Sequence, residues 1–298
     1  MNIPHISICI ATCGRPKMLD RLLREIARQQ TGGLFTFSVV VTDNDKECSA
    51  RPVIDAFNSD SGTKIVYAIE PERNIAVVRN TALAHASGDF IVFIDDDEFP
   101  VPDWLRNLFQ TCQEHKVAGV LGPVKPHFDQ KPPSWLVKGG FYDRPTHPTG
   151  FLMGWDECRT GNVLFRFDIL DPMKPPFDRE FRTGGEDRDF FRRMIQKGHK
   201  FIWCDEAVAY ETVPTSRWSR RFLLSRALLR GRISLQHPKH RVRIILKSLV
   251  AVPVYTLALP FLLVAGHHYF MKYLVRLTDH IGRLLAVVRL NPMRDRPM

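Results

Sequence analysis

Short apolar runs alternate with helix-length segments through the first 125 residues, and this alternation most constrains the fold. The runs are continuously apolar, which is typical of strands covered on both faces of a sheet. The segments between them are long enough to form helices that connect parallel strands. We therefore predict an α/β fold with a mainly parallel central sheet. Strands are expected at 5–11, 37–41, 64–69, 90–94 and 117–121, and helices at 18–30, 51–58, 76–86 and 102–115.

The six cysteines are scattered through the 298 residues without a CxxC pair. This spacing argues against a disulfide framework and a cysteine-based zinc site, and it indicates reduced cytosolic thiols. The first residues, MNIPHISICIATCGRP, lack the charged and apolar regions of a signal peptide, so none is expected.

Positive charge is concentrated at the C-terminal end of the chain. Residues 214–298 hold 16 of the 42 Lys and Arg but only 2 of the 32 Asp and Glu. The rest of the chain is mildly acidic. Basic residues at 217–232 are interleaved with Trp, Phe and Leu at helical spacing, which predicts a basic amphipathic helix.

An uncharged segment, Ser248–Gly266, follows this predicted helix. As a helix it would be roughly 28 Å long, close to the thickness of a bilayer core. Basic residues flank it on both sides, and such flanks tend to stay in the cytosol. We therefore expect an in-plane or re-entrant helical hairpin, with 273–290 as a second interfacial helix. A nucleic-acid binder is the alternative, but the bilayer-length apolar run favours a membrane surface with anionic lipids and no nucleic acid.

Three motifs contain acidic or basic residues that could bind a metal ion or phosphate or act as a general base. GDFIVFIDDDE ends a predicted strand, and alternation places Asp95 and Asp97 on one side. Two carboxylates there suit Mg²⁺ or Mn²⁺ that also binds a diphosphate, although an acidic loop or a helix cap has the same pattern.

GGEDRDFFRRM places Glu186 and Asp187 at a helix start, as a general base or as partners of the helix dipole. PERNIAVVRNTAL places Arg79 on a helix, either as a partner of phosphate or Asp43 or as a surface residue. Because ligands of parallel sheets bind at the carboxyl ends of strands, we expect the polar residues that end each strand to gather there: Thr12, Arg15, Asp43, Asn44 and Asp95–Asp97.

Taken in order, these motifs make residues 4–215 resemble the family 2 inverting glycosyltransferases, which have the GT-A fold. The matching segments are ISICIATCGRP, VVVTDND, ERNIAVVRN, ASGDFIVFIDDDE, TGNVLFR and GGEDRDFFRRM. The resemblance is strongest to bacterial enzymes that build exopolysaccharides or lipid-linked saccharides. It implies a glycosyltransferase domain over 1–215, with a nucleotide-sugar half (1–125) and an acceptor half (126–215), and a membrane-associated tail over 216–298.

The resemblance also implies a role for each matching residue. Asp187 is expected to be the catalytic base with Glu186 beside it, and Asp97 and Asp95 are expected to bind Mg²⁺ or Mn²⁺. Contacts to the nucleotide sugar are expected from Thr12, Arg15, Asp43, Arg79, Asp95 and Asp96, and acceptor contacts from Gly161, Asn162 and Trp218.

Two positions depart from the family pattern, and Trp218 is ambiguous. The second strand ends in DND where the family more often has two Asp followed by Ser. Tyr210–Glu211 stands where relatives often place a metal-binding His, so Glu211 is a candidate oxygen ligand. Trp218 either contacts sugar or diphosphate or anchors the chain at a membrane interface, and processive extrusion is not expected.

The expected reaction transfers sugar, with inversion, from a nucleotide sugar, with UDP the family expectation. The acceptor is a lipid-linked or polysaccharide chain, met at the cytoplasmic face of the plasma or inner membrane. The alternatives are a nucleotidyltransferase or phosphohydrolase that uses Asp95 and Asp97, and a catalytically inactive scaffold. A P-loop NTPase is disfavoured because GxxxxGK[ST] is missing from the sequence.

Overall fold

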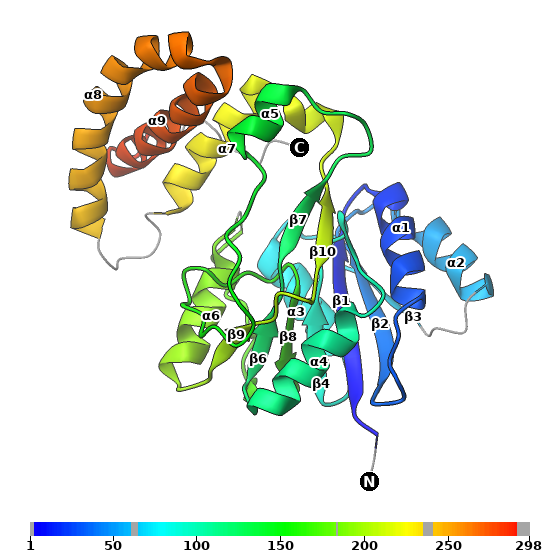
Figure 1. Ribbon diagram of the computed structural model, residues 1–298. Helices are drawn as coiled ribbons and strands as arrows, with labels where there is room; N and C mark the ends of the chain where they lie inside the picture. The colour runs from blue at the N-terminus through cyan, green and yellow to red at the C-terminus, as the bar shows by residue number, and fades with distance from the viewer. Residues whose placement is uncertain (1–2, 61–64, 183, 235–240, 291–298) are drawn as a thin grey trace. The chain divides into compact units, whose positions relative to one another are not determined.

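The computed structural model describes residues 3–60, 65–182, 184–234 and 241–290 (Figure 1). The chain forms two compact units, 1–127 with 144–212 and 128–143 with 213–298. The chain passes into the second unit at Val213, close to the domain boundary expected at 215. Residues 128–143, however, belong to the second unit, although the sequence suggested the first domain. Lys64, from a predicted strand, and residues 235–240 and 291–298, from the predicted tail, lie outside the described residues.

Most strands of the first unit join one sheet. Its seven strands lie in the order β3-β2-β1-β4-β8-β6-β9, and the small second sheet has the order β5-β10-β7. In the large sheet β8 runs antiparallel to both neighbours and the other pairs are parallel, so the predicted mainly parallel sheet is confirmed. The strands are β1 (His5–Thr12), β2 (Thr36–Asp43), β3 (Ile65–Ile69), β4 (Phe90–Phe93), β5 (Glu98–Pro100), β6 (Gly119–Leu121), β7 (Val124–His127), β8 (Val163–Arg166), β9 (Phe201–Trp203) and β10 (Ala209–Thr212).

Helices cover both faces of this sheet, as the continuous apolar strands required. Successive side chains of β1 point to opposite faces, so Ile8 and Ile10 pack in one core cluster and Cys9 in the other. The first cluster takes side chains from α1, α2 and α4, and the second from α3 and α6. These helices are α1 (Pro16–Ala27), α2 (Arg51–Asp60), α3 (Ile75–His85), α4 (Trp104–His115) and α6 (Glu186–Gln196), with a short 3-10 helix η1 (Phe167–Ile169) after β8.

The register of the parallel strands brings their polar ends to one edge. Thr12 pairs with Asp43 across β1 and β2, and Cys9 pairs with Phe93 across β1 and β4. The residues that follow Phe93 therefore emerge beside the end of β1. This is the edge at which the sequence predicted a ligand site.

Asn162 joins the segments that surround the start of β8. It adopts a left-handed backbone conformation (φ +64°), which Asn tolerates better than most residues. Its fully buried side chain accepts from Trp104 Nε1 at 2.7 Å and donates to the carbonyls of Pro123 at 2.9 Å and Ala207 at 2.8 Å. The amide thus uses both its N–H donors and its carbonyl oxygen to hold three other segments together.

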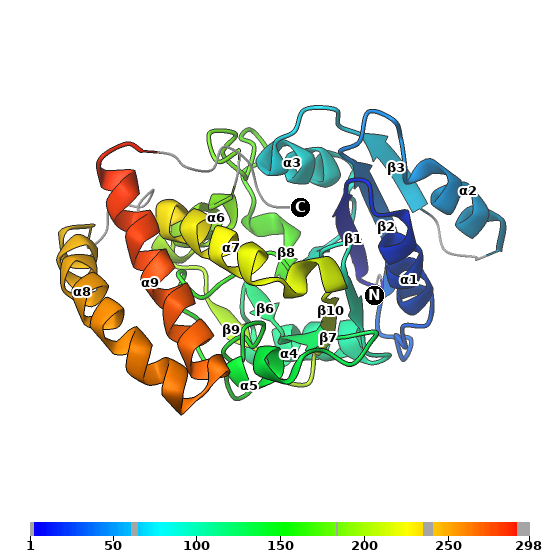
Figure 2. The same ribbon diagram turned by 90° about the horizontal axis from the view of Figure 1, so that it is seen from above.

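The second unit is helical. Its elements are α5 (Ser134–Gly139), η2 (Thr215–Trp218), α7 (Arg220–Ile233), α8 (Arg241–Ala265) and α9 (His267–Val287). Helix α9 packs against both α7 and α8, and Figure 2 shows the three side by side in the order α7, α9, α8. Helices α7 and α9 approach closely at two glycines, because a Cβ on Gly231 would lie 2.2 Å from the carbonyl of Asp279 and one on Gly282 would lie 2.5 Å from that of Leu228.

This packing corrects the prediction for the basic helix. The buried residues of α7, among them Leu223 and Ala227, pack within the second unit, and α7 lies against α9. Its most buried side therefore faces protein and is not available to a membrane. Helix α9 forms the expected helical hairpin with α8 and also packs against α7, so it is the central helix of the unit; an interfacial position of α9 stays a prediction. Helix α8 is long and apolar enough to cross a membrane.

Replacing Asn162 tests its place in the core. In Asn162→Ala the Trp104 indole N–H and two carbonyls lose their buried partners, and each unsatisfied group costs on the order of 1–3 kcal/mol. We expect the free energy of unfolding to fall by about 3 kcal/mol or more, measured by urea denaturation. Asn107→Ala removes one hydrogen bond at the surface, to the Glu206 carbonyl, and should change stability by less than about 1 kcal/mol. Equal effects of the two variants would contradict this assignment.

Candidate active site

Four consecutive acidic residues, Asp95–Glu98, follow β4 at the polar edge of the sheet. A turn closed by a 3.0 Å hydrogen bond from the Glu98 N–H to the Asp95 carbonyl folds the run back into β5. Asp96, Asp97 and Glu98 are buried, whereas the Asp95 side chain is 44% exposed. Buried carboxylates need counter-charges, and three arginines from separate segments supply them.

The first arginine, Arg15, precedes α1. Its Nη1 lies 2.8 Å from Asp96 Oδ1 and 3.3 Å from Asp97 Oδ2, and Thr12 donates to Asp96 Oδ2 at 2.9 Å. Burial raises the pKa of Asp96 to about 6, even though Arg15 and Thr12 favour its charged form. The predicted grouping of Thr12, Arg15 and the acidic run is therefore present. Both carboxylate oxygens of Asp96 have protein partners, Arg15 on Oδ1 and Thr12 on Oδ2.

The second arginine, Arg79, lies on α3 and is buried. It forms ion pairs with Glu186 at the start of α6 and, at 3.4 Å, with Asp95 Oδ1. Burial opposes its charge, but Glu186 and Asp95 hold the pKa of Arg79 above its ordinary value. The interpretation of Arg79 as a surface residue is therefore wrong. The alternative prediction that Arg79 pairs with Asp43 is also wrong, because its ion pairs are with Glu186 and Asp95.

Two asparagines of the ERNIAVVRN segment attach the chain before α6 to α3. Asn74 caps α3 by accepting from the Ala76 N–H and donates to the Arg179 carbonyl at 2.9 Å. Asn80 exchanges two hydrogen bonds with the backbone of Phe177. These hydrogen bonds hold residues 177–179, which precede α6, against α3, so that the start of α6 lies beside Arg79.

The GGED turn then begins α6. Gly184 and Gly185 both have positive φ angles, 125° and 102°, which only glycine adopts readily. Glu186 is buried in its pair with Arg79, whereas Asp187 is half-buried and its Oδ1 accepts from the Arg188 N–H at 2.7 Å. Asp187 lies close enough to Arg79 to favour its charge. Of the two predicted catalytic carboxylates, Asp187 is thus the more accessible.

The third arginine, Arg144, was not recognised from the sequence. It pairs with Glu211 on β10, and its Nη1 lies 4.0 Å from Glu98 Oε1. Glu98 and Glu211 are partners in the antiparallel register of β5 and β10. Glu98 ends the conspicuous acidic run, which was a usable signal, but no motif marks Arg144.

Asp95 and Glu98 converge on Gly161. A Cβ at residue 161 would lie 2.9 Å from Glu98 Oε1 and 3.1 Å from Asp95 Oδ2. Glu98 Oε1 is buried and accepts no hydrogen bond from the residues that the structure describes. Burial, and then Asp95, raise the pKa of Glu98 well above its ordinary value.

These oxygens fit a hard divalent cation. Carboxylates are its preferred ligands, and Mg²⁺ is commonly held by one or two of them together with substrate phosphates. Among the described residues no group of three or more His, Cys, Asp or Glu side chains is arranged as a metal site. A bound cation would therefore take its remaining ligands from phosphate and water.

Asp43 ends β2, which is separated from β4 by β1, and it is fully buried. Its carboxylate accepts from the N–H groups of Ala50 and Asp45 and from the Tyr67 hydroxyl, at 2.9, 3.0 and 2.9 Å. It shapes the turn after β2, and a contact with a nucleotide base stays a prediction.

The predicted acceptor residues have different environments. Gly161 lies against the acidic run, but Asn162 is fully buried and bonded, so it cannot touch an acceptor and its role is structural. Trp218, in the second unit, donates to the Val213 carbonyl at 3.0 Å and packs edge-on against Phe128. Its indole is thus part of the packing of that unit, and both predicted contacts of Trp218 stay predictions.

Comparison with known proteins identifies the family of the chain. The family model for glycosyl transferase family 2 matches residues 7–171. Succinoglycan biosynthesis protein ExoM of Rhizobium meliloti is 35% identical over 231 residues, which cover 76% of this chain and 73% of that protein. Chondroitin synthase of Escherichia coli is 24% identical over 247 residues, but the match covers only 36% of its length against 72% of this chain.

Solved structures share the fold at low sequence identity. The mannosyltransferase PcManGT of Pyrobaculum calidifontis, in complex with GDP-Man and Mn²⁺, has a TM-score of 0.65 at 18% identity, covering 97% of this chain and 87% of that one. TarS 1–349 of S. aureus, in complex with UDP, has a TM-score of 0.55 at 15% identity, covering 94% and 89%. These likenesses confirm the GT-A fold. From the family model and the relative at 35% identity, this chain belongs to glycosyl transferase family 2.

Proposed function

We propose that this glycosyltransferase moves a sugar from a nucleotide sugar, with inversion, to a lipid-linked or polysaccharide acceptor during exopolysaccharide synthesis. The observation that carries the proposal is the buried Arg79–Glu186 pair. It joins the half of the unit that holds the acidic run to the half that holds Asp187. A candidate base and a candidate diphosphate site are thereby held on either side of one arginine.

Asp187 would act as the general base. Its carboxylate would take the proton of an acceptor hydroxyl while that oxygen forms a bond to the anomeric carbon. The bond from that carbon to the diphosphate oxygen breaks at the same time, and the nucleoside diphosphate leaves with the electron pair. One displacement inverts the configuration. Positioned general bases contribute roughly 10²–10⁴ in rate.

Glu186, Arg79 and Arg15 would position the reacting groups. Glu186 is occupied by Arg79, so it orients α6 and does not transfer the proton. Arg15 is partly exposed above Asp96 and Asp97, where it can also reach a phosphate.

A divalent cation, Mg²⁺ or Mn²⁺, would be held by carboxylates of the acidic run, for which Asp95 and Asp97 are the sequence candidates and Glu98 adds a buried oxygen. When bound, it would neutralise charge on the departing diphosphate. Mn²⁺ in the PcManGT complex supports such dependence. The neighbours hold UDP in one case and GDP-Man in the other. We propose UDP on the family expectation.

The acceptor and location are proposed from the relative and the tail. ExoM is named for succinoglycan biosynthesis, which supports an exopolysaccharide or its lipid-linked precursor as acceptor. The apolar α8 and the basic residues near it support membrane attachment at the cytoplasmic face, where anionic lipids attract Lys and Arg.

The Asp187→Asn variant tests the base. We expect transfer to fall by about 10²–10⁴ while the Kd of the nucleotide sugar changes little, because the lost group acts on the acceptor proton. Calorimetry would measure donor binding and a sugar-release assay would measure turnover. Asp168→Asn, on η1 at the far end of the sheet, is the control and should retain activity. Loss of donor binding together with transfer would assign Asp187 a structural or metal-binding role.

The Asp97→Ala variant tests the cation site. In the native chain we expect Mn²⁺ and a UDP-sugar together to raise Tm, and the variant should lose this shift. Differential scanning fluorimetry with and without EDTA would measure it. Asp20→Ala removes an exposed carboxylate paired with Arg24 and should keep the shift. A native chain insensitive to Mg²⁺ and Mn²⁺ would refute metal dependence.

The Arg79–Glu186 pair can be tested by stability and activity together. Arg79→Met removes the guanidinium that pairs with the buried Glu186 carboxylate, which should lower the free energy of unfolding by about 3–5 kcal/mol. The double variant Arg79→Met/Glu186→Leu should recover much of that stability and remain inactive. Recovery of activity in the double variant would mean that the pair does not position the site.

A further inference from the structure

The outer face of α8 is apolar along its length. Phe261 and Leu257 are 78% and 73% exposed, and Val242 and Val264 at the two ends are 70% and 91% exposed. No charged residue occurs between Ser248 and Gly266. A continuous exposed apolar face is typical of a surface that binds a membrane or another apolar protein surface.

The opposite face of α8 is occupied by α9. Ser248 is fully buried, and its hydroxyl lies 2.9 Å from His280 Nδ1, whereas the ring of Tyr255 contacts that of Tyr273 with centroids 5.5 Å apart. These contacts fix an antiparallel pair in which 267–280 of α9 runs beside the uncharged segment of α8. The apolar face is therefore the side of α8 that α9 does not cover.

The charged residues of α9 argue against an orientation in which α8 and α9 together span a membrane. Lys272, Arg276 and Asp279 lie on the stretch beside the uncharged segment of α8. Asp279 is also bonded to Arg230 of α7, on the other side of α9, at 2.9 Å. A membrane-spanning α8 would carry these charges, and α7 with them, into hydrocarbon, where charged side chains are strongly disfavoured.

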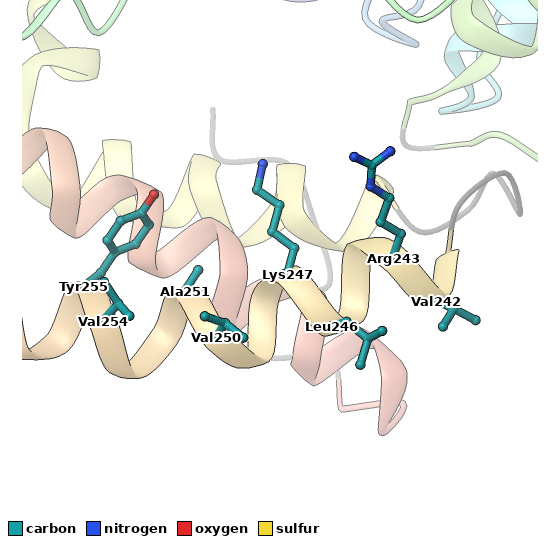
Figure 3. Close-up of a pocket in the computed structure, with 8 residues that line it drawn as sticks. All are labelled: Val242, Arg243, Leu246, Lys247, Val250, Ala251, Val254 and Tyr255. Atoms are coloured by element: carbon teal, nitrogen blue, oxygen red, sulfur yellow. The ribbon is translucent and has the colours of Figure 1, made fainter.

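Two basic residues lie beside the apolar face of α8, near its N-terminal end. Figure 3 shows Arg243 and Lys247 projecting to one side of the helix, and Val242 and Leu246 to the opposite side. An open groove of about 900 Å³ runs along this part of α8 and is lined by both kinds of side chain. An apolar face bordered by cations matches a helix that lies at the level of anionic headgroups with its apolar side in the acyl chains.

We infer that α8 docks in the plane of an anionic phospholipid bilayer and enters one leaflet only. Its outer face lies in the acyl region, Arg243 and Lys247 contact headgroup phosphates, and α9 and α7 stay on the aqueous side. Both ends of α8 then lie on the same side of the membrane. This inference rests on the membrane attachment in the proposed function and specifies its geometry, but it does not depend on the transfer reaction.

Vesicle binding tests the apolar face and the basic flank with the full-length chain. Leu257→Asp/Phe261→Asp should lower binding to phosphatidylglycerol-containing vesicles at least about tenfold, because both side chains enter lipid. Arg243→Gln/Lys247→Gln should lower it about tenfold on these vesicles and hardly on pure phosphatidylcholine. The control Ile3→Asp/Met173→Asp, at exposed apolar positions of the first unit, should bind normally. Unchanged binding of the Leu257/Phe261 variant would overturn the inference.

Cysteine labelling distinguishes an in-plane helix from a spanning one, independently of the binding measurements. Single cysteines would be placed before and after the apolar segment, as Arg241→Cys and His268→Cys, in a chain whose Cys13 and Cys48 are serine. In sealed vesicles, a membrane-impermeant maleimide added from one side should label both positions to the same extent. If one position reacts only after detergent is added, α8 spans the bilayer and the inference is wrong.

Discussion

The acidic run after β4 carries more negative charge than a protein interior accepts without compensation, and much of the first unit is arranged around that constraint. Its counter-charges come from three segments far apart in the sequence: Arg15 before α1, Arg79 on α3 and Arg144 in the chain that leads to β8. Because Arg79 also binds Glu186, the same compensation determines where α6 begins. The geometry of the proposed active site and its charge balance are therefore coupled.

The compensation is incomplete, and this links the resting site to the proposed reaction. Burial and mutual repulsion keep the pKa of Glu98 raised, and one of its buried oxygens accepts no hydrogen bond from the described part of the chain. A divalent cation would relieve this excess of negative charge, and a diphosphate would complete its coordination. The carboxylates would then contribute to donor binding at the expense of stability in the ligand-free protein, a trade that functional sites often make.

The second unit meets a different constraint. Its central helix α9 is held by glycine contacts with α7 and by the buried Asp279, which binds Arg230 and Arg283. These polar and small residues give α9 a protein environment on the side of α7. Helix α8 is left with an exposed apolar face that only lipid or another apolar surface can cover. Two neighbouring helices of similar length thus have opposite surroundings, and the difference follows from where their charges lie.

The sequence by itself determined the layered α/β fold, the polar edge where Thr12, Arg15 and Asp95–Asp97 meet, and the apolar character of α8. These are local properties, since continuous apolar runs define buried strands and parallel strands end together. Only the tertiary structure decided that Arg144 pairs with Glu98 and Glu211, that Asn162 is a core residue, and that the buried side of α7 packs against α9. Each depends on strand register or helix packing between residues distant in the chain, which no local spacing encodes.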